Sequence, residues 1–264
     1  MPLLHQGYKK LGKNSSGGIN MHIKKWLFTL AGSFLLCNTL QAQNLVVGVQ
    51  NFTYNPLHSI QNDQLTGFSR ELFDEFAKAN DYKISYQPTD IENISGELTS
   101  GQLDFAYPEN PDWLAKENQA NTFQFSKPIV SFTDGLLVKP DNANKPLDAI
   151  KTIGALKGFT LTGYLDEINS GKIKVITADS IDDLLQRVID GQIDAAYVNV
   201  AVADYHLENF LQQPNALVFA NNLPNVKDDY TVATAKNPQA IAQFNQFLDS
   251  HAEWVDNLKQ KYEL

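Results

Sequence analysis

Short apolar stretches alternate with amphipathic stretches along nearly the whole chain after residue 42. The apolar stretches have the length and composition of buried strands, and the amphipathic ones place apolar side chains on one helix face, as Leu72, Phe73 and Phe76 do. Such alternation is typical of a largely parallel sheet in an α/β fold. The pattern predicts strands at residues 45–50, 83–87, 103–107, 130–138, 151–156, 172–176, 194–198 and 229–235. It predicts helices at residues 69–80, 91–100, 161–169, 181–190, 238–250 and 252–262.

One junction of this pattern occurs twice, as GQLDFAY at residues 101–107 and as GQIDAAY at residues 191–197. Each copy predicts a helix that ends on a left-handed glycine, a tight turn and a short buried strand. Ligands of open α/β sheets bind at the carboxyl ends of strands, so we expect Tyr107 and Tyr197 to face a cleft from opposite sides. The functional interpretation is that two similar lobes face each other and close on a small molecule. A chance match of a common junction is the alternative.

The first 42 residues have the features of an export signal. Lys24 and Lys25 precede an apolar segment at 26–36 that is too short to span a bilayer, and Ala42 supplies a small residue at the expected cleavage site. We therefore predict a signal peptide at residues 21–42, preceded by an upstream extension at 1–20. A retained membrane anchor is the alternative. Lipidation at Cys37 is not expected, because Leu36 is bulkier than lipoprotein signal peptidases favour.

Removal of this segment changes the charge and the cysteine count. Five of the 21 basic residues lie before position 43, so the remaining 16 basic and 30 acidic residues give a formal charge of −14. Nucleic acid is therefore excluded as a partner, since phosphate binding needs clustered lysine and arginine. The only cysteine also leaves, and an exported chain without cysteine fits the periplasm. His58, His206 and His251 are scattered singly, so we expect no metal and no cofactor.

Two extended segments suit connections between two lobes. The apolar segment 130–138 would cross to the second lobe near Asp134, and 229–235 would return after a crossing near Asn225. The predicted domains are residues 43–134 with 225–264 for lobe 1, and 135–224 for lobe 2.

Several short motifs together resemble the bacterial family 3 extracytoplasmic solute-binding proteins, which are periplasmic receptors of polar-amino-acid ABC importers. The motifs are YNP at 54–56, GF at 67–68, GQLD at 101–104, FSKP at 125–128, KGFT at 157–160 and the helix at 258–262. The resemblance covers the whole chain after the signal. It implies a periplasmic-binding-protein type II clamshell, in which two α/β lobes are joined by a two-strand hinge and enclose the ligand.

The chain departs from this family at the ligand anchors. Amino-acid-binding members carry an arginine after the third strand for the ligand carboxylate and an aspartate after the second-lobe Asp-Ala strand for its ammonium. Here residues 107–116 contain no arginine, and Asn199 stands in place of the aspartate. Because an unpaired zwitterion in a closed cleft would suffer a large desolvation penalty, we expect the ligand not to be a standard α-amino acid. The alternative is that Lys116 or Arg70 replaces the arginine; Arg187 is expected on the exposed side of its helix.

The predicted cleft is aromatic and rich in amides and acids. Aromatic residues at strand ends or in the loops after them are Phe52, Tyr54, Tyr107, Trp113, Phe159 and Tyr197. Further candidates are Glu109, Asn110, Lys116, Asp134, Gly158, Thr160 and Asn199. Flat rings with polar groups suit a planar or sugar-like ligand, the acids would suit a cationic or hydroxylated one, and Gly158 and Thr160 are expected at a helix N-terminus. The alternative is that some rings are core and the acids are ordinary surface residues.

The sequence thus predicts a monomeric periplasmic binding protein that passes a small polar molecule to the membrane permease of an ABC importer. A ligand sensor that presents its closed form to a membrane signalling receptor is one alternative. The other is an enzyme like the periplasmic cyclohexadienyl dehydratases, with Glu109 or Lys116 as general acid or base. No nucleophile elbow or cysteine–histidine pair supports catalysis.

Overall fold

The computed structural model describes residues 43–61, 64–115 and 122–264. The predicted signal peptide and upstream extension lie outside the described residues, as does Lys116. Among the helices that are described, none is long and apolar enough to cross a membrane.

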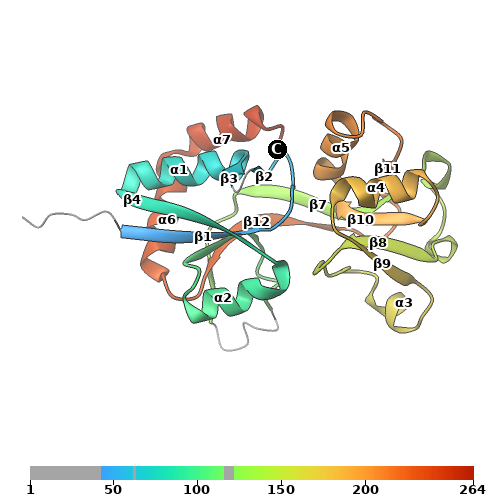
Figure 1. Cartoon of the computed structure of the whole chain (residues 1–264), viewed down its shortest axis with the longest axis horizontal. Helices are drawn as coiled ribbons and strands as arrows, with labels where there is room; N and C mark the ends of the chain where they lie inside the picture. The colour runs from blue at the N-terminus through green and yellow to red at the C-terminus, as the bar shows by residue number, and fades with distance from the viewer. Residues whose placement is uncertain (1–42, 62–63, 116–121) are drawn as a thin grey trace, which may run out of the picture. The chain divides into compact units, whose positions relative to one another are not determined.

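The described chain forms two groups of parallel strands that are joined by two long antiparallel strands (Figure 1). The sheet order is β4-β1-β5-β12-β7-β10-β8-β9. The first lobe contains β1 (Gln43–Gln50), β4 (Tyr82–Thr89) and β5 (Phe105–Glu109). The second contains β8 (Thr152–Leu156), β9 (Lys174–Ala178) and β10 (Ala195–Asn199). The joining strands are β7 (Val130–Val138) and β12 (Val226–Thr234), and smaller strands are β2 (Ser59–Gln61), β3 (Gln64–Thr66), β6 (Gln124–Phe125) and β11 (Val218–Phe219).

Helices cover both groups of strands. In Figure 1, α1 and α7 lie above the strands of the first lobe and α2 lies below them. The first-lobe helices are α1 (Phe68–Asn80), α2 (Ile94–Ser100), α6 (Pro238–Ser250) and α7 (Ala252–Lys261). The second-lobe helices are α3 (Leu165–Asn169), α4 (Ile181–Ile189) and α5 (Val200–Asn209). Short 3₁₀ turns occur at Ile91–Asn93, Pro140–Asn142 and Leu147–Ala149.

The core of the first lobe is built from phenylalanine rings. Phe73 and Phe76 on the apolar face of α1 pack against Phe244 of α6, with ring centroids 5.6 and 5.0 Å apart. Phe105 of β5 lies 6.2 Å from the Phe244 ring. Aromatic pairs in these geometries add to the burial of apolar area, so this cluster fixes α1 and α6 on the sheet.

The sequence repeat marks the same structural junction in both lobes. Gly101 caps α2 and Gly191 follows the C-cap of α4, with φ angles of +83° and +73° that glycine adopts without a steric cost. The Asp104 carboxylate then accepts a 2.7 Å hydrogen bond from the Val46 N–H of β1, and Asp194 accepts a 2.8 Å bond from the Thr152 N–H of β8. The repeated aspartate therefore satisfies a backbone donor near the start of the neighbouring parallel strand.

The structure corrects one predicted helix boundary and adds one helix. The helix expected at 161–169 begins only at Leu165, because Gly163 has a φ angle of +92° and the preceding residues form turns. Helix α5 was not predicted, since its apolar residues do not form a strong single face; the capping residue Asn199, which accepts a 3.0 Å hydrogen bond from the Val202 N–H, was the available signal.

We expect Asp194→Ala to lower the free energy of unfolding by about 1–3 kcal/mol, because it leaves the N–H groups of Lys151 and Thr152 without their charged acceptor. Asp190→Ala, at an exposed position of the same junction, is the matched control and should have a smaller effect. Urea unfolding of both variants measures the difference. Equal losses would show that the carboxylate of Asp194 has no special role.

Candidate functional site

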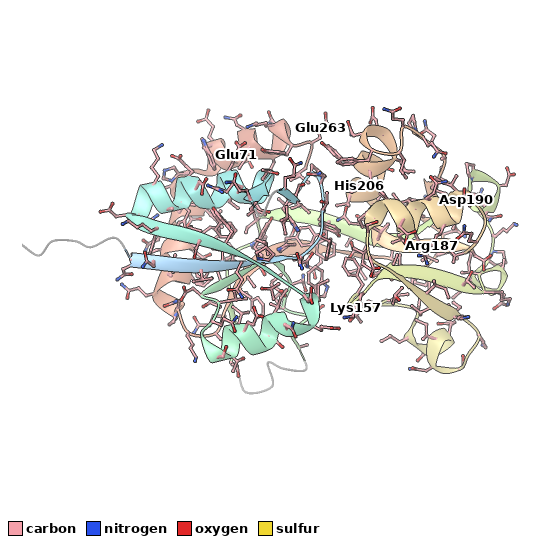
Figure 2. All side chains as sticks on the ribbon, in the orientation of Figure 1. Glu71, Lys157, Arg187, Asp190, His206 and Glu263 are labelled. Carbon is pink, nitrogen blue, oxygen red and sulfur yellow. The ribbon has the colours of Figure 1, made fainter. Side chains whose placement is uncertain are left out.

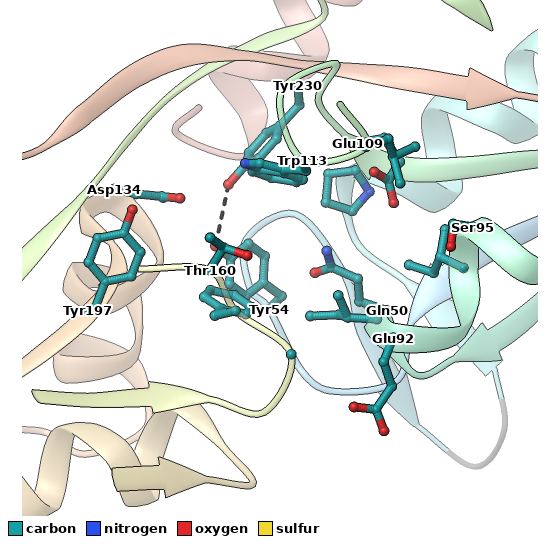
Figure 3. Close-up of a pocket in the computed structure, with 16 residues that line it drawn as sticks. Gln50, Tyr54, Glu92, Ser95, Glu109, Trp113, Asp134, Thr160, Tyr197 and Tyr230 are labelled. Carbon is teal, nitrogen blue, oxygen red and sulfur yellow. Dashed lines mark hydrogen bonds between the residues drawn. The ribbon is translucent and has the colours of Figure 1, made fainter. Parts of the chain in front are cut away.

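A cavity of about 210 Å³ lies where strands of both lobes end (Figure 3). Its size is below the roughly 300–1,000 Å³ of clefts that take drug-sized ligands, so it suits a small solute. Eight of the predicted residues line it: Tyr54, Glu109, Trp113, Asp134, Gly158, Phe159, Thr160 and Tyr197. The remaining lining residues are Gln50, Ile91, Glu92, Ile94, Ser95, Pro108, Leu114 and Tyr230.

The cavity walls come from elements that are far apart in the sequence. Gln50 ends β1 and Glu109 ends β5 in the first lobe, while Tyr197 lies on β10 in the second. Asp134 and Tyr230 lie on the joining strands β7 and β12. This placement at the carboxyl ends of strands is the usual position of ligand sites in α/β sheets.

Aromatic contacts cross from one lobe to the other beside the cavity. The Phe159 ring of the second lobe lies 6.1 Å from Phe52 and 6.3 Å from Tyr54 of the first. On the joining strand, the Tyr230 hydroxyl accepts a 3.0 Å hydrogen bond from Asn199 and lies 3.4 Å from the Tyr54 hydroxyl. These groups hold one wall of the cavity in place.

Two carboxyl groups of the cavity are buried. Glu109 is 4% exposed and Asp134 is 6% exposed. Burial raises the pKa of Glu109 to about 8, against a smaller opposing effect of the Asn110 backbone N–H. Burial likewise raises the pKa of Asp134 to about 7. Both groups thus change charge near neutral pH, and a nearby cation would favour their ionised forms.

Two acceptor atoms at the cavity have no hydrogen-bond partner among the described residues. They are Oδ1 of Asp134 and Oε1 of Gln50, both buried. Because buried polar atoms are normally paired, these oxygens are suited to a donor supplied by a ligand.

No lysine or arginine is found among the described residues that line the cavity, whereas Glu92, Glu109 and Asp134 are acidic. Arg70 instead forms a 2.5 Å ion pair with Asp74 on α1, and its guanidinium lies over the Tyr86 ring. Arg187 of the second lobe (Figure 2) is paired with Asp183 on α4. The proposed replacement of the missing arginine by Arg70 therefore finds no support in this geometry, and Lys116 lies outside the described residues.

Four predicted site residues do not line this cavity. Contrary to expectation, Tyr107 lies in the first-lobe core, where its ring packs against Phe73 and Tyr230. Asn110 holds its loop by donating to the Asp229 carbonyl and accepting from the Asp112 N–H. Asn199 caps α5, and Phe52 packs against the rings beside the cavity. These contacts explain the four residues structurally.

The expectation for Gly158 and Thr160 is corrected in one respect. Both line the cavity, but they lie in a turn after β8 and not at a helix N-terminus, since α3 begins at Leu165. An anion site at a helix end is therefore not present at these residues. Among the lining residues that were not predicted, Gln50 carried a usable signal, because it is a polar residue at the end of an apolar strand.

Comparison with known proteins places the chain in a family. Residues 45–263 match the profile of the bacterial extracellular solute-binding proteins, family 3. The chain belongs to this family. It is 26% identical to a probable histidine-binding protein of Campylobacter jejuni, over 90% of this chain and 97% of the relative. It is 27% identical to the probable amino-acid-binding protein YxeM of Bacillus subtilis, over 68% of this chain and 71% of the relative.

Several solved structures share the architecture of this chain. An ancestral arginine-binding protein bound to arginine has a TM-score of 0.68 at 21% identity, covering 84% of this chain and 99% of that one. The ancestral amino acid-binding protein AncCDT-1, a precursor of cyclohexadienyl dehydratase, has a TM-score of 0.65 at 21% identity, covering 83% and 95%. The VFT2 domain of Bordetella pertussis BvgS has a TM-score of 0.63 at 20% identity, covering 83% and 93%. At these identities the likeness shows the fold, which is the predicted type II clamshell.

We expect the stability of the unliganded protein to fall as the pH rises from about 5 to 8, and Glu109→Gln to reduce this fall. Glu109 keeps its proton in the folded state up to a pKa of about 8, whereas the unfolded chain loses it near 4.5. Each pH unit inside this window costs the folded wild type about 1.4 kcal/mol relative to the variant.

Urea unfolding of both proteins across this pH range measures the effect. The other groups with shifted pKa values, among them His58, Asp134 and His206, are present in both proteins, so we expect their contributions to cancel in the difference. Parallel stability curves for wild type and variant would contradict a buried protonated Glu109.

Proposed function

We propose that the protein is a periplasmic solute-binding protein that captures a small solute between its two lobes and delivers it to the permease of an ABC importer. The observation that carries this proposal is the small cavity lined by both lobes, with buried acceptors that lack partners. Support for delivery comes from relatives such as the putative amino-acid ABC transporter-binding protein PatH of Vibrio harveyi. A ligand that contacts both lobes favours the closed state over the open one.

The hinge of this movement is the pair of joining strands. The proposed lobes are residues 43–134 with 225–264, and residues 135–224. Support comes from the ladder between β7 and β12, in which Asp134 pairs with Val226 beside both proposed boundaries. Export by a signal peptide at residues 21–42 is part of the same proposal.

The ligand is proposed not to be a standard α-amino acid. Histidine- and arginine-binding proteins occur among the relatives and structural neighbours, so an amino acid is the obvious alternative. The described lining offers no cationic side chain for an α-carboxylate, while Glu109 and Asp134 would repel one in their ionised forms. A carboxylate buried without a cation would suffer a desolvation penalty of several kcal/mol.

Calorimetric titration of the purified protein with the standard amino acids and cystine tests this proposal. We expect none of them to bind with micromolar affinity. Micromolar binding of any one would mean that the carboxylate is held by a group not identified here, and the exclusion of α-amino acids would be wrong. Small-angle scattering on any ligand that binds then shows whether the lobes close.

Catalysis is a second candidate because of one observation, the buried carboxyl of Glu109 with its raised pKa in a cavity. The relatives of this chain are named as binding proteins, which favours solute binding over catalysis. Turnover of prephenate or arogenate by the purified protein would decide for the enzyme.

A further inference from the structure

The two buried carboxyls are held at opposite ends of the cavity. Glu109 of β5 pairs with Thr231 of β12, and Asp134 of β7 pairs with Val226 of the same strand. Five residues of extended strand span roughly 17 Å, so the two backbones are well separated. Figure 3 shows Tyr230 and Trp113 between the two carboxyls. One ammonium group, which must lie within hydrogen-bond distance of each carboxylate it binds, cannot serve both.

Each end of the cavity also presents an acceptor atom that needs a donor. At one end Oδ1 of Asp134 is buried without a partner among the described residues. At the other, Gln50 lies on the same side of the cavity as Glu109 in Figure 3, and its Oε1 is also without a described partner. An ammonium group donates three hydrogen bonds and accepts none, so it can satisfy these oxygens together with the carboxylate oxygens of Glu109 and Asp134.

The space between the two ends is lined by aromatic rings. Trp113 and Tyr230 lie with their centroids 5.9 Å apart, and the Tyr54 ring lies 6.3 Å from that of Phe159. Such rings bury methylene groups and attract cations to their faces. They therefore provide an apolar surface for the hydrocarbon part of a ligand, which the two carboxyls cannot provide.

Charge balance favours two cationic groups over one. With both carboxyls ionised, the buried part of the cavity carries two negative charges, and its described lining supplies no positive side chain. A zwitterion would add a third carboxylate, whereas a dication leaves each buried charge paired. The volume of about 210 Å³ restricts such a ligand to a short chain.

We propose that the cavity binds a short α,ω-diammonium compound, with one ammonium group at Glu109 and Gln50 and the other at Asp134. This inference rests on the proposed solute-binding function and names its substrate class. The aromatic rings then cover the methylene chain between the two ammonium groups.

The test compares four probes of similar length: cadaverine, pentylamine, 5-aminovalerate and pentanediol. We expect calorimetry to show cadaverine binding at least tenfold more tightly than pentylamine, because only the diamine neutralises both carboxyls. Aminovalerate and pentanediol should bind far more weakly. Putrescine is included so that a shorter chain is also tested. Tight binding of either diamine supports the proposal.

Isosteric variants test whether each buried carboxyl binds one ammonium group of the ligand. Glu109→Gln and Asp134→Asn should each weaken diamine binding at least tenfold and reduce the preference for diamine over monoamine. Glu253→Gln removes a carboxylate from an exposed position of α7 and serves as the matched control, which should bind like the wild type. Circular dichroism of each unliganded variant confirms that it is folded.

The outcomes separate this inference from the proposed function. Equal affinity for diamine and monoamine, or no binding of either diamine, overturns the dication assignment. If aminovalerate or an α-amino acid binds instead, solute capture stands and only the substrate class is wrong. If no solute binds and mass spectrometry finds none in the protein purified from the periplasm, both proposals fail.

Discussion

The antiparallel ladder between β7 and β12 is the constraint on which the rest of the structure depends. It pairs Val130–Asp134 with Val226–Tyr230 in unbroken register. β12 also pairs with β5 on its other side, so a single strand positions groups from both ends of the cavity. Asp134, Tyr230 and Glu109 are therefore placed by backbone hydrogen bonds, which makes their spacing a property of the sheet rather than of flexible loops.

The buried carboxyls give the cavity its electrostatic character. Glu109 and Asp134 are withdrawn from water without a described cation beside them, and burial alone raises the pKa of each. Ionising these two carboxyls in the empty cavity thus costs free energy, and a cationic ligand can offset that cost. A group removed from water in this way destabilises the unliganded closed state and increases the gain when the ligand arrives.

The direct contacts between the lobes are modest by comparison. Lys157 and Glu92 form a 2.7 Å ion pair across the cleft, but their side chains are 64% and 53% exposed. Exposed ion pairs contribute little to stability, so this pair does not hold the lobes closed by itself. The aromatic contact of Phe159 with Phe52 and Tyr54 is less exposed to solvent than this pair. Most of the energy of closure must then come from the ligand, as expected for a protein that has to open again.

Local patterns in the sequence determined much of the architecture. The alternation of strands and helices, the left-handed glycines 101 and 191 and the apolar face of α1 are short-range features, and each specifies its element directly. They failed where side-chain orientation matters. Tyr107 and Tyr197 occupy equivalent positions in the middle of β5 and β10, yet Tyr107 packs into the core while Tyr197 lines the cavity. Asn199 stands where a ligand-binding acid was expected and instead caps a helix.

The sequence by itself determined the fold class, the two junctions and the absence of an arginine after the third strand, because each is encoded within a few neighbouring residues. Only the tertiary structure decided which polar groups share a cavity. Gln50, Glu109, Asp134 and Tyr230 come from four strands. Their meeting depends on sheet order and register, which are long-range properties that no local pattern specifies.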